Sequence, residues 1–295
     1  MKNGLIIINK PEGITSQKAV LRVKRLLGIQ KAGHTGTLDP LATGVLPILV
    51  ERGVKASEFM LTADKHYSAT LLLGLTTDTE DITGKALTEC DRIPTEDEVR
   101  TAVSSFVGGY MQTPPMYSAL KVGGKKLCDL AREGIEIHRE ARPVTVFSID
   151  VERISDREYS LDVHCSKGTY IRTLCADIGK KLQVGGVMKT LTRSSASGFT
   201  LNEAKTLEEL EKMTGEERER AVYPVSYIFK DLPRVTLQPF FARLAHCGLE
   251  IYQKKIGSDF SVGERVSLYD CDGFFAVGEV REYEGGSAIK PIRQF

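Results

Sequence analysis

The hydrophobic positions near the amino terminus predict a strand followed by a helix. Residues 5–8 form a short apolar run that ends at an Asn-Lys-Pro-Glu-Gly turn signal, which is typical of a buried strand. Apolar residues recur at helical spacing over residues 17–27. Thr15 precedes them as a candidate N-cap, and Gly28 follows as a candidate residue to end the helix.

Strands and helices remain mixed farther along the chain. Residues 67–74 are β-rich, and residues 144–151 and 159–165 predict two strands joined by a short polar stretch. Residues 169–182 carry apolar positions at helical intervals. Strands at hairpin spacing, interspersed with helices, favour an α+β fold with a mixed, largely antiparallel sheet.

The pattern changes near residue 232. Pro224 and Pro233 interrupt helical continuity after an acidic stretch, and short alternating runs with turn signals follow. Asp272-Gly273 stands between two of these runs and is a strong hairpin signal. We therefore expect a larger domain over residues 1–231 and a small β-rich domain over residues 232–295.

Composition limits the classes of protein that fit. The chain has 295 residues, of which 41% are hydrophobic and 27% charged, as in ordinary globular proteins. The formal charge of +1 means that a nucleic-acid partner would have to be met by a local basic patch. The apolar run at residues 5–8 is too short for a secretory leader or a membrane span, so we expect a cytoplasmic protein. No two of the six cysteines are three apart, which argues against a structural zinc site.

The densest candidate for chemistry is the segment Gly33–Pro47. Its three glycines and two prolines predict a shaped, rigid loop and no regular element. Asp39 lies in the middle and precedes Pro40, which favours an extended backbone. Two interpretations stay open: a catalytic carboxylate, or an aspartate that caps a helix beginning at Pro40. A phosphate-binding loop is excluded because no Gly-Lys-Ser/Thr follows.

Two further segments carry charge in unusual places. Arg172 follows a strand-to-helix turn and falls in the first helical turn, where the helix dipole disfavours a cation. Such an arginine usually has an acidic partner or an anionic ligand, although a surface arginine without a role is the plain alternative. Residues 121–142 hold six bases against four acids, with a Gly123-Gly124 hinge. This stretch fits either a flexible element that closes over RNA or an exposed linker.

Two other features are less specific. Residues 78–84 resemble a calcium loop only superficially, because Ile82 and Thr83 stand where an oxygen ligand and a glycine are needed, so we expect a polar loop. Residues 17–31 carry five bases and no acid, which indicates either a solvated helix face or a surface that contacts phosphates.

Taken together, these segments resemble the bacterial TruB family of tRNA pseudouridine synthases. The motif Gly-His-Thr-Gly-x-Leu-Asp-Pro-x-Ala-x-Gly, beginning at Gly33, is specific to this family and its relatives, and other matching stretches keep the family order over the first two hundred residues. The resemblance implies an enzyme that isomerises the uridine at position 55 in the T-loop of tRNA. It also implies a PUA-like RNA-binding module over residues 232–295, and no extended basic tail like that of the snoRNA-guided relatives follows it. We expect a stand-alone monomer without cofactor, metal, membrane attachment or obligate protein partner.

The resemblance also assigns roles to single residues. Asp39 would be the catalytic aspartate, Arg172 would pair with it, and Tyr67 would stack on the flipped base and assist in removing the C5 proton. Residues 116–140 would form a mobile thumb that closes on the tRNA T-arm. The substrate-binding positions would be His34, which contacts the T-loop, Lys10 and Pro11, which shape the pocket floor, Leu191, which packs in the pocket, and Tyr117 and Lys121 on the thumb.

This chemistry suits a chain with a single candidate carboxylate. Substrate and product are isomers, so no redox cofactor or energy donor is required, and a glycosidase would need a second acid in a matching context. One competing hypothesis is an RNA-binding or RNA-folding factor that uses the same surfaces without chemistry. Another, a nucleotide-dependent kinase or GTPase, is disfavoured by the missing Lys-Ser/Thr.

Overall fold

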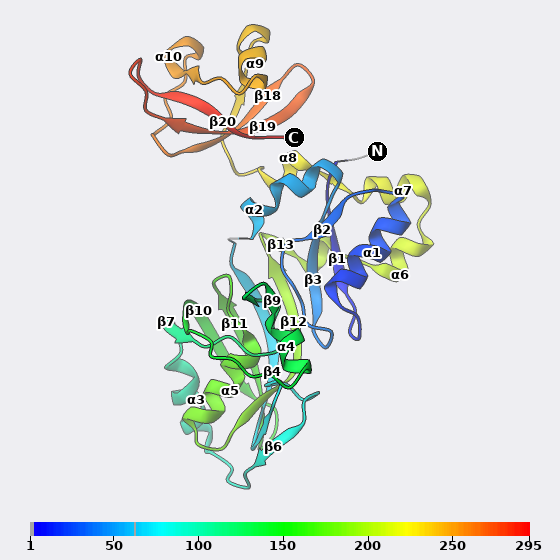
Figure 1. The fold of residues 1–295 in the computed structure, drawn as a ribbon, viewed down its shortest axis with the longest axis vertical. Helices are drawn as coiled ribbons and strands as arrows, with labels where there is room; N and C mark the ends of the chain where they lie inside the picture. The colour runs from blue at the N-terminus through cyan, green and yellow to red at the C-terminus, as the bar shows by residue number, and fades with distance from the viewer. Residues whose placement is uncertain (1–2, 62) are drawn as a thin grey trace.

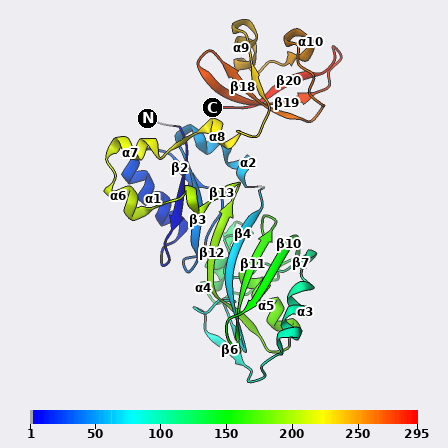
Figure 2. The same ribbon diagram turned by 180° about the vertical axis from the view of Figure 1, so that it is seen from behind.

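The computed structural model describes residues 3–61 and 63–295. Within these residues the strands form an 11-stranded sheet, a 5-stranded sheet and two short two-stranded pairs. The larger sheet runs along most of an elongated molecule, and the smaller sheet lies at one end (Figures 1 and 2). The chain therefore has the α+β fold that its hydrophobic pattern predicts.

The larger sheet is mostly antiparallel. Only β1–β14 and β3–β12 pair in parallel among its described strands. Its main path is, in spatial order, β14 (Lys205–Thr206), β1 (Gly4–Lys10), β3 (Thr43–Val50), β12 (Gly186–Ala196), β4 (Lys65–Leu73), β11 (Glu158–Cys165), β10 (Arg142–Arg153) and β7 (Gly108–Gln112). Three short strands join this path at its sides: β2 (Ala32–His34), β13 (Phe199–Thr200) and β15 (Tyr223–Pro224).

Helices pack on this sheet around one large apolar core. The first, α1 (Ser16–Leu27), begins where the Thr15 hydroxyl accepts a hydrogen bond from the Lys18 amide, and it ends at Gly28 with a φ of 62°. Figure 1 shows α6 (Leu207–Lys212) and α7 (Gly215–Arg220) beside α1, while α3 (Glu96–Ser104) and α5 (Ile171–Lys181) lie over β10, β11 and β4. The shorter helices are η1 (Glu51–Ala56), α2 (Ser57–Met60), α4 (Leu127–Arg132), η2 (Leu201–Glu203), α8 (Val225–Ile228), α9 (Pro239–His246) and α10 (Gln253–Ile256).

Residues 113–141 form an insertion between β7 and β10. The insertion contains a small hairpin, β8 (Lys121–Val122) and β9 (Lys125–Lys126), followed by α4. Met116, Leu127 and Leu130 give it a small apolar core of its own. Away from the insertion, a second short pair, β5 (Leu75–Thr77) and β6 (Ala86–Glu89), flanks residues 78–84, which form the expected polar loop.

The carboxy-terminal residues build the 5-stranded sheet around a separate apolar core. Its order is β16 (Arg234–Thr236), β18 (Arg265–Asp270), β19 (Gly273–Arg281), β20 (Ala288–Gln294) and β17 (Ile251–Tyr252), and the sheet curls into a half-barrel. The Asp-Gly signal does mark the hairpin between β18 and β19. Arg293 joins this sheet to α2 through an ion pair with Glu58 at 2.6 Å.

The segment Gly33–Pro47 departs from the prediction that it contains no regular element. Its first residues belong to β2 and its last residues to β3, because residues 44–50 pair with β1 and their apolar side chains are buried on the faces of the sheet. No helix begins at Pro40, since residues 40–42 bend directly into β3. Within the part of the chain that the structure describes, no helix has both the length and the apolar character needed to cross a membrane.

Candidate active site

The loop between β2 and β3 holds Asp39 at the edge of a large pocket. Ser16, at the start of α1, fixes Leu38, the residue that precedes Asp39. The Ser16 hydroxyl accepts a hydrogen bond from the Leu38 amide at 2.8 Å and donates one to the Leu38 carbonyl at 3.0 Å. The Asp39 carbonyl accepts from the Ala42 amide at 3.1 Å and closes the turn. The Asp39 side chain keeps 34% of its surface exposed. Its backbone is thus fixed while its carboxylate stays open to the pocket.

Arg172 holds the Asp39 carboxylate and connects it to two other loops. Its Nε donates to Oδ2 of Asp39 at 2.8 Å, Nη1 to the Thr79 carbonyl at 2.9 Å, and Nη2 to the Tyr117 carbonyl at 2.8 Å. The side chain is 4% exposed. A buried cation is costly unless its hydrogen bonds are satisfied, and here each guanidinium nitrogen has an acceptor. The acidic partner that the helix-dipole argument requires is Asp39.

The start of α5 places Arg172 in this position. Gln112, at the end of β7, uses its side-chain amide on both backbone groups of Tyr170, the residue that precedes the helix. Its Oε1 accepts from the Tyr170 amide at 2.8 Å, and its Nε2 donates to the Tyr170 carbonyl at 3.0 Å. Gln112 is itself buried. The helix therefore begins at a point fixed by the neighbouring strand.

A second carboxylate, that of Asp81, lies near the same guanidinium. Its Oδ2 is 3.9 Å from Nε of Arg172, and its Oδ1 accepts from the Thr79 hydroxyl and from both the amide and the hydroxyl of Thr83. The Asp81 side chain is only 9% exposed. All three of these hydrogen bonds go to Oδ1 from within the same loop, so Asp81 gives that loop its shape while Oδ2 is the oxygen nearer Arg172.

Tyr67 forms another wall of the pocket. It lies on β4 opposite Arg193 of β12, and burial raises the pKa of its phenol while the Arg193 guanidinium opposes that rise. Arg193 is almost fully buried and donates to the carbonyls of Val45 at 2.8 Å and Gly36 at 3.1 Å. Gly44 permits this packing, because a Cβ there would lie 2.2 Å from the Arg193 carbonyl oxygen.

The pocket has a volume of about 1070 Å³ and is lined by residues that are far apart in the sequence. Six of the predicted site residues lie in its wall: His34, Asp39, Tyr67, Tyr117, Arg172 and Leu191. Basic side chains from four segments share the wall with them: Lys65, Lys126, Arg132, Lys167 and Arg193. An anionic substrate of considerable size therefore suits this pocket.

Three predicted substrate-binding residues lie outside the wall. Lys10 is fully buried, and its ammonium donates to the carbonyls of Pro11, Ile14 and Pro40, so it supports the Asp39 loop from behind. Burial lowers the pKa of Lys10 to about 8. Pro11 lies in the turn that Lys10 holds, and Lys121 is exposed on β8. Lys126, which pairs with Lys121 across the hairpin, lines the pocket instead.

His34 combines pocket exposure with an unusual polar environment. Its Nδ1 atom is buried and lacks a hydrogen-bond partner among the described residues. Burial, assisted by the nearby Arg193 guanidinium, lowers the pKa of His34 below its usual value. The lowered pKa favours the neutral imidazole of His34, which can both donate and accept a hydrogen bond at the pocket wall.

The structure adds two residues to the site that the sequence did not single out with a role. Arg193 had only its place in a stretch that resembles the family, and Asp81 had only its place in a polar loop. Both owe their positions to contacts made across the sheet or with Arg172.

The chain compares closely with known proteins. A family model described as "TruB family pseudouridylate synthase (N terminal domain)" matches residues 24–171, and one described as "tRNA pseudouridylate synthase B C-terminal domain" matches residues 172–239. The "tRNA pseudouridine synthase B" of Alkaliphilus oremlandii is 43% identical over 99% of this chain and 98% of the relative. That of Methylobacillus flagellatus is 42% identical over 94% of this chain and 91% of the relative.

A solved structure agrees with these relatives. A chain in the crystal structure of a Cbf5–Nop10–Gar1 complex superposes with a TM-score of 0.71 at 26% identity, covering 99% of this chain and 85% of that one. The fold and the arginine-held aspartate in a basic pocket define an enzyme of the pseudouridine synthase class. Within this class, the chain belongs to the TruB family.

Proposed function

We propose that this protein converts the uridine at position 55 in the T-loop of tRNA to pseudouridine. The observation that carries the proposal is the Asp39 carboxylate, held at 2.8 Å by the buried Arg172 and open on its other side to a pocket lined by Tyr67. The names of the relatives support tRNA as the substrate. The matching motif around Asp39 supports the T-loop position.

The reaction breaks the bond from N1 to C1′ of the nucleoside and joins C1′ to C5. The proton leaves C5, N1 gains one, and the product is an isomer of the substrate, so the chain needs to supply only acid–base or nucleophilic groups. Asp39 is the reacting group, acting on the sugar, on the base or on the 2′ proton. Tyr67 supports the base and assists in removing the C5 proton. Arg172 positions the carboxylate through its charge-assisted hydrogen bond.

The target uridine must leave its stack before it reaches Asp39. Extrusion costs a few kcal/mol, and stacking on an aromatic ring returns about 1–3 kcal/mol per base. The Tyr67 ring on the pocket wall is placed to supply that contact. The insertion at residues 113–141 contributes Tyr117, Lys126 and Arg132 to the same wall, which supports its role as a thumb over the T-arm.

We further propose that residues 1–231 form the catalytic domain and residues 232–295 an RNA-binding module of the PUA type. The separate sheet and separate apolar core after residue 232 support this division. In this proposal the protein works as a cytoplasmic monomer without an obligate protein partner, and the pocket residues supply the chemistry without a cofactor.

Tritium release tests the proposal directly. The full chain is incubated with a T-arm stem-loop that carries C5-tritiated uridine at position 55, without added cofactor and with EDTA present. We expect one tritium released per RNA, and none from a matched stem-loop that is labelled at a different uridine. Binding of the stem-loop without any release would instead support an RNA-folding factor, and release from both RNAs would remove the assignment of position 55.

A further inference from the structure

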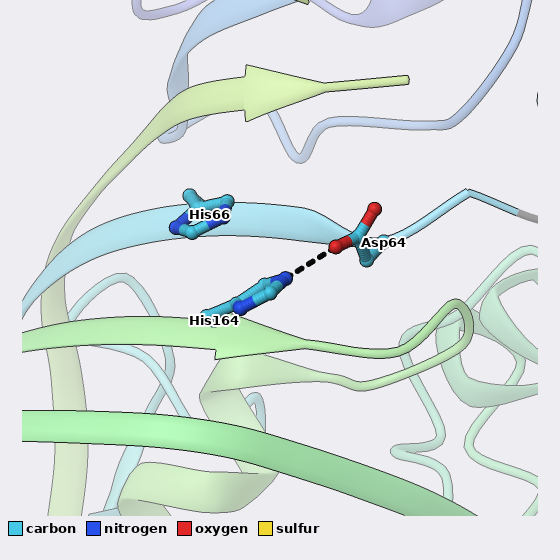
Figure 3. A group of neighbouring side chains, drawn as sticks. All are labelled: Asp64, His66 and His164. Carbon is cyan, nitrogen blue, oxygen red and sulfur yellow. Dashed lines mark hydrogen bonds and ion pairs between the residues drawn. The ribbon is translucent and has the colours of Figure 1, made fainter. Parts of the chain in front are cut away.

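Three side chains that can ligate a metal converge on the sheet face opposite the pocket. Asp64 immediately precedes β4, His66 lies on β4, and His164 lies on β11 (Figure 3). One donor atom from each lies within 4.8 Å of the others. The side chains of Asp64 and His164 are hydrogen-bonded, and the His66 and His164 rings stack with centroids 3.9 Å apart.

The strand register produces this convergence. Asp64 and His66 are two residues apart, so their side chains leave the chain on the same side, and His164 is directly opposite His66 in the antiparallel pair of β4 and β11. Lys65 and Tyr67 alternate with them and line the pocket on the other face. The group is therefore separate from the proposed reaction.

We propose that Asp64, His66 and His164 form a binding site for a divalent transition-metal ion, with Zn²⁺ as the representative ion. Two imidazoles and one carboxylate are a common ligand set for such ions, and three protein ligands leave a further position for water. Bound ligand atoms in a tetrahedral zinc site lie about 3.4 Å apart, given bonds of about 2.0–2.2 Å. The His66 and His164 rings are stacked with an interplanar angle of 12°, so at least one ring must turn before the in-plane lone pairs of both can meet at one ion. The Asp64 side chain, 51% exposed, has solvent around it and can move with them.

The surroundings suit a bound cation. Solvent reaches the group, because 26% of the His164 side chain and half of the Asp64 side chain are exposed. The Phe147 ring, whose centroid is 4.7 Å from that of His164, lies at a bulge of β10 and covers one side of the imidazole. An ion here would tie the first residues of β4 to the last residues of β11.

A chelator-competition titration with Zn²⁺ tests the site. It uses the metal-stripped full chain under reducing conditions, together with three variants: Asp64→Asn, His66→Gln and His164→Gln. We expect one tight equivalent for the unaltered chain, and an affinity at least 10-fold weaker for each variant. His138→Gln is the matched control, because His138 belongs to neither group of neighbouring candidate metal ligands among the described residues. This control should bind Zn²⁺ like the unaltered chain.

Two further readouts make the result decisive. Circular dichroism in EDTA confirms that each variant is folded, and Zn²⁺ should raise the melting temperature of the unaltered chain but not that of His66→Gln. Co²⁺ should give a visible spectrum without thiolate charge transfer. Equal Zn²⁺ binding by Asp64→Asn and the unaltered chain would overturn the proposal. So would a thiolate band from the exposed Cys247 or Cys271.

Discussion

The loop that carries Asp39 and the loop that carries Asp81 present a carboxylate to the same guanidinium in opposite ways. Asp39 makes its side-chain hydrogen bond to Arg172 alone among the described residues, and a third of its surface is open. Asp81 is 9% exposed, lies 3.9 Å from Arg172, and accepts three hydrogen bonds from Thr79 and Thr83.

The difference indicates that the Asp81 carboxylate stabilises its loop, whereas the Asp39 carboxylate is available to react. A carboxylate that is buried and hydrogen-bonded within its own loop stabilises that loop and offers little exposed surface to a substrate. A carboxylate with one fixed partner and one free side is oriented but still available. Arg172 joins the two functions, since it binds Asp39 and also the Thr79 carbonyl beside Asp81.

Replacing the shared guanidinium should have the largest effect. Arg172→Met leaves Asp39 without its partner and the carbonyls of Thr79 and Tyr117 without a donor, so we expect a loss of about 3–5 kcal/mol in the free energy of unfolding together with loss of activity. Urea denaturation and tritium release measure the two effects. Arg132→Met removes an exposed arginine from the same pocket wall and should change the free energy of unfolding by no more than about 0.5 kcal/mol. Equal stability of the two variants would contradict the role given to Arg172.

A smaller effect is expected when the support behind Arg172 is removed. Gln112→Leu leaves both backbone groups of Tyr170 without their side-chain partner, which should cost about 1–3 kcal/mol in the free energy of unfolding. Activity should fall less than 10-fold or so, because the Asp39–Arg172 pair survives. Gln238→Leu, next to α9 and without a side-chain cap bond, is the matched control and should behave like the unaltered chain. Thermal melts with single-turnover tritium release distinguish the two.

The effect expected to be smallest over a single pH unit is a pH dependence from Lys10, which supports the Asp39 loop. Because burial lowers the pKa of Lys10 to about 8 from its ordinary 10.5, the folded protein releases this proton before the unfolded chain does. Stability from this residue should therefore rise between pH 8 and 10.5, by at most about 1.4 kcal/mol per pH unit. The measurement is the difference in unfolding free energy between the unaltered chain and Lys10→Met at several pH values. A difference that stays flat or falls with pH would contradict the burial argument.

Local signals in the sequence predicted those elements whose ends are set by their own residues. The helix α1 was predicted in full because Thr15 and Gly28 fix its two ends locally. The strand β3 was missed because it forms through pairing with β1 and β12, and its glycines and Pro47 resemble a loop. Strand register and burial determine the structure of the segment Gly33–Pro47, and neither can be deduced from those fifteen residues alone.

The candidate site was predicted through its motif and only partly through physical reasoning. The helix position of Arg172 indicated that it needed an acid, but the 133 residues to Asp39 could be bridged only by family resemblance. Arg193 and Asp81 gave no comparable signal, because their roles depend on a partner across the sheet or in another loop. The His66–His164 pair could not be predicted from sequence spacing either, because the two residues become neighbours only through the register of β4 and β11.

The most direct test of the account compares two isosteric changes on the same guanidinium, Asp39→Asn and Asp81→Asn. Each variant is mixed in excess with the T-arm stem-loop, and single-turnover tritium release is measured at equal RNA occupancy and equal folded fraction. The account predicts that Asp39→Asn slows release by at least about 100-fold, as for a lost catalytic acid, base or nucleophile, while it still binds RNA. It predicts that Asp81→Asn lowers the melting temperature and slows release by less than about 10-fold. An Asp39→Asn variant that releases tritium as fast as Asp81→Asn would contradict the assignment of Asp39 as the reacting carboxylate.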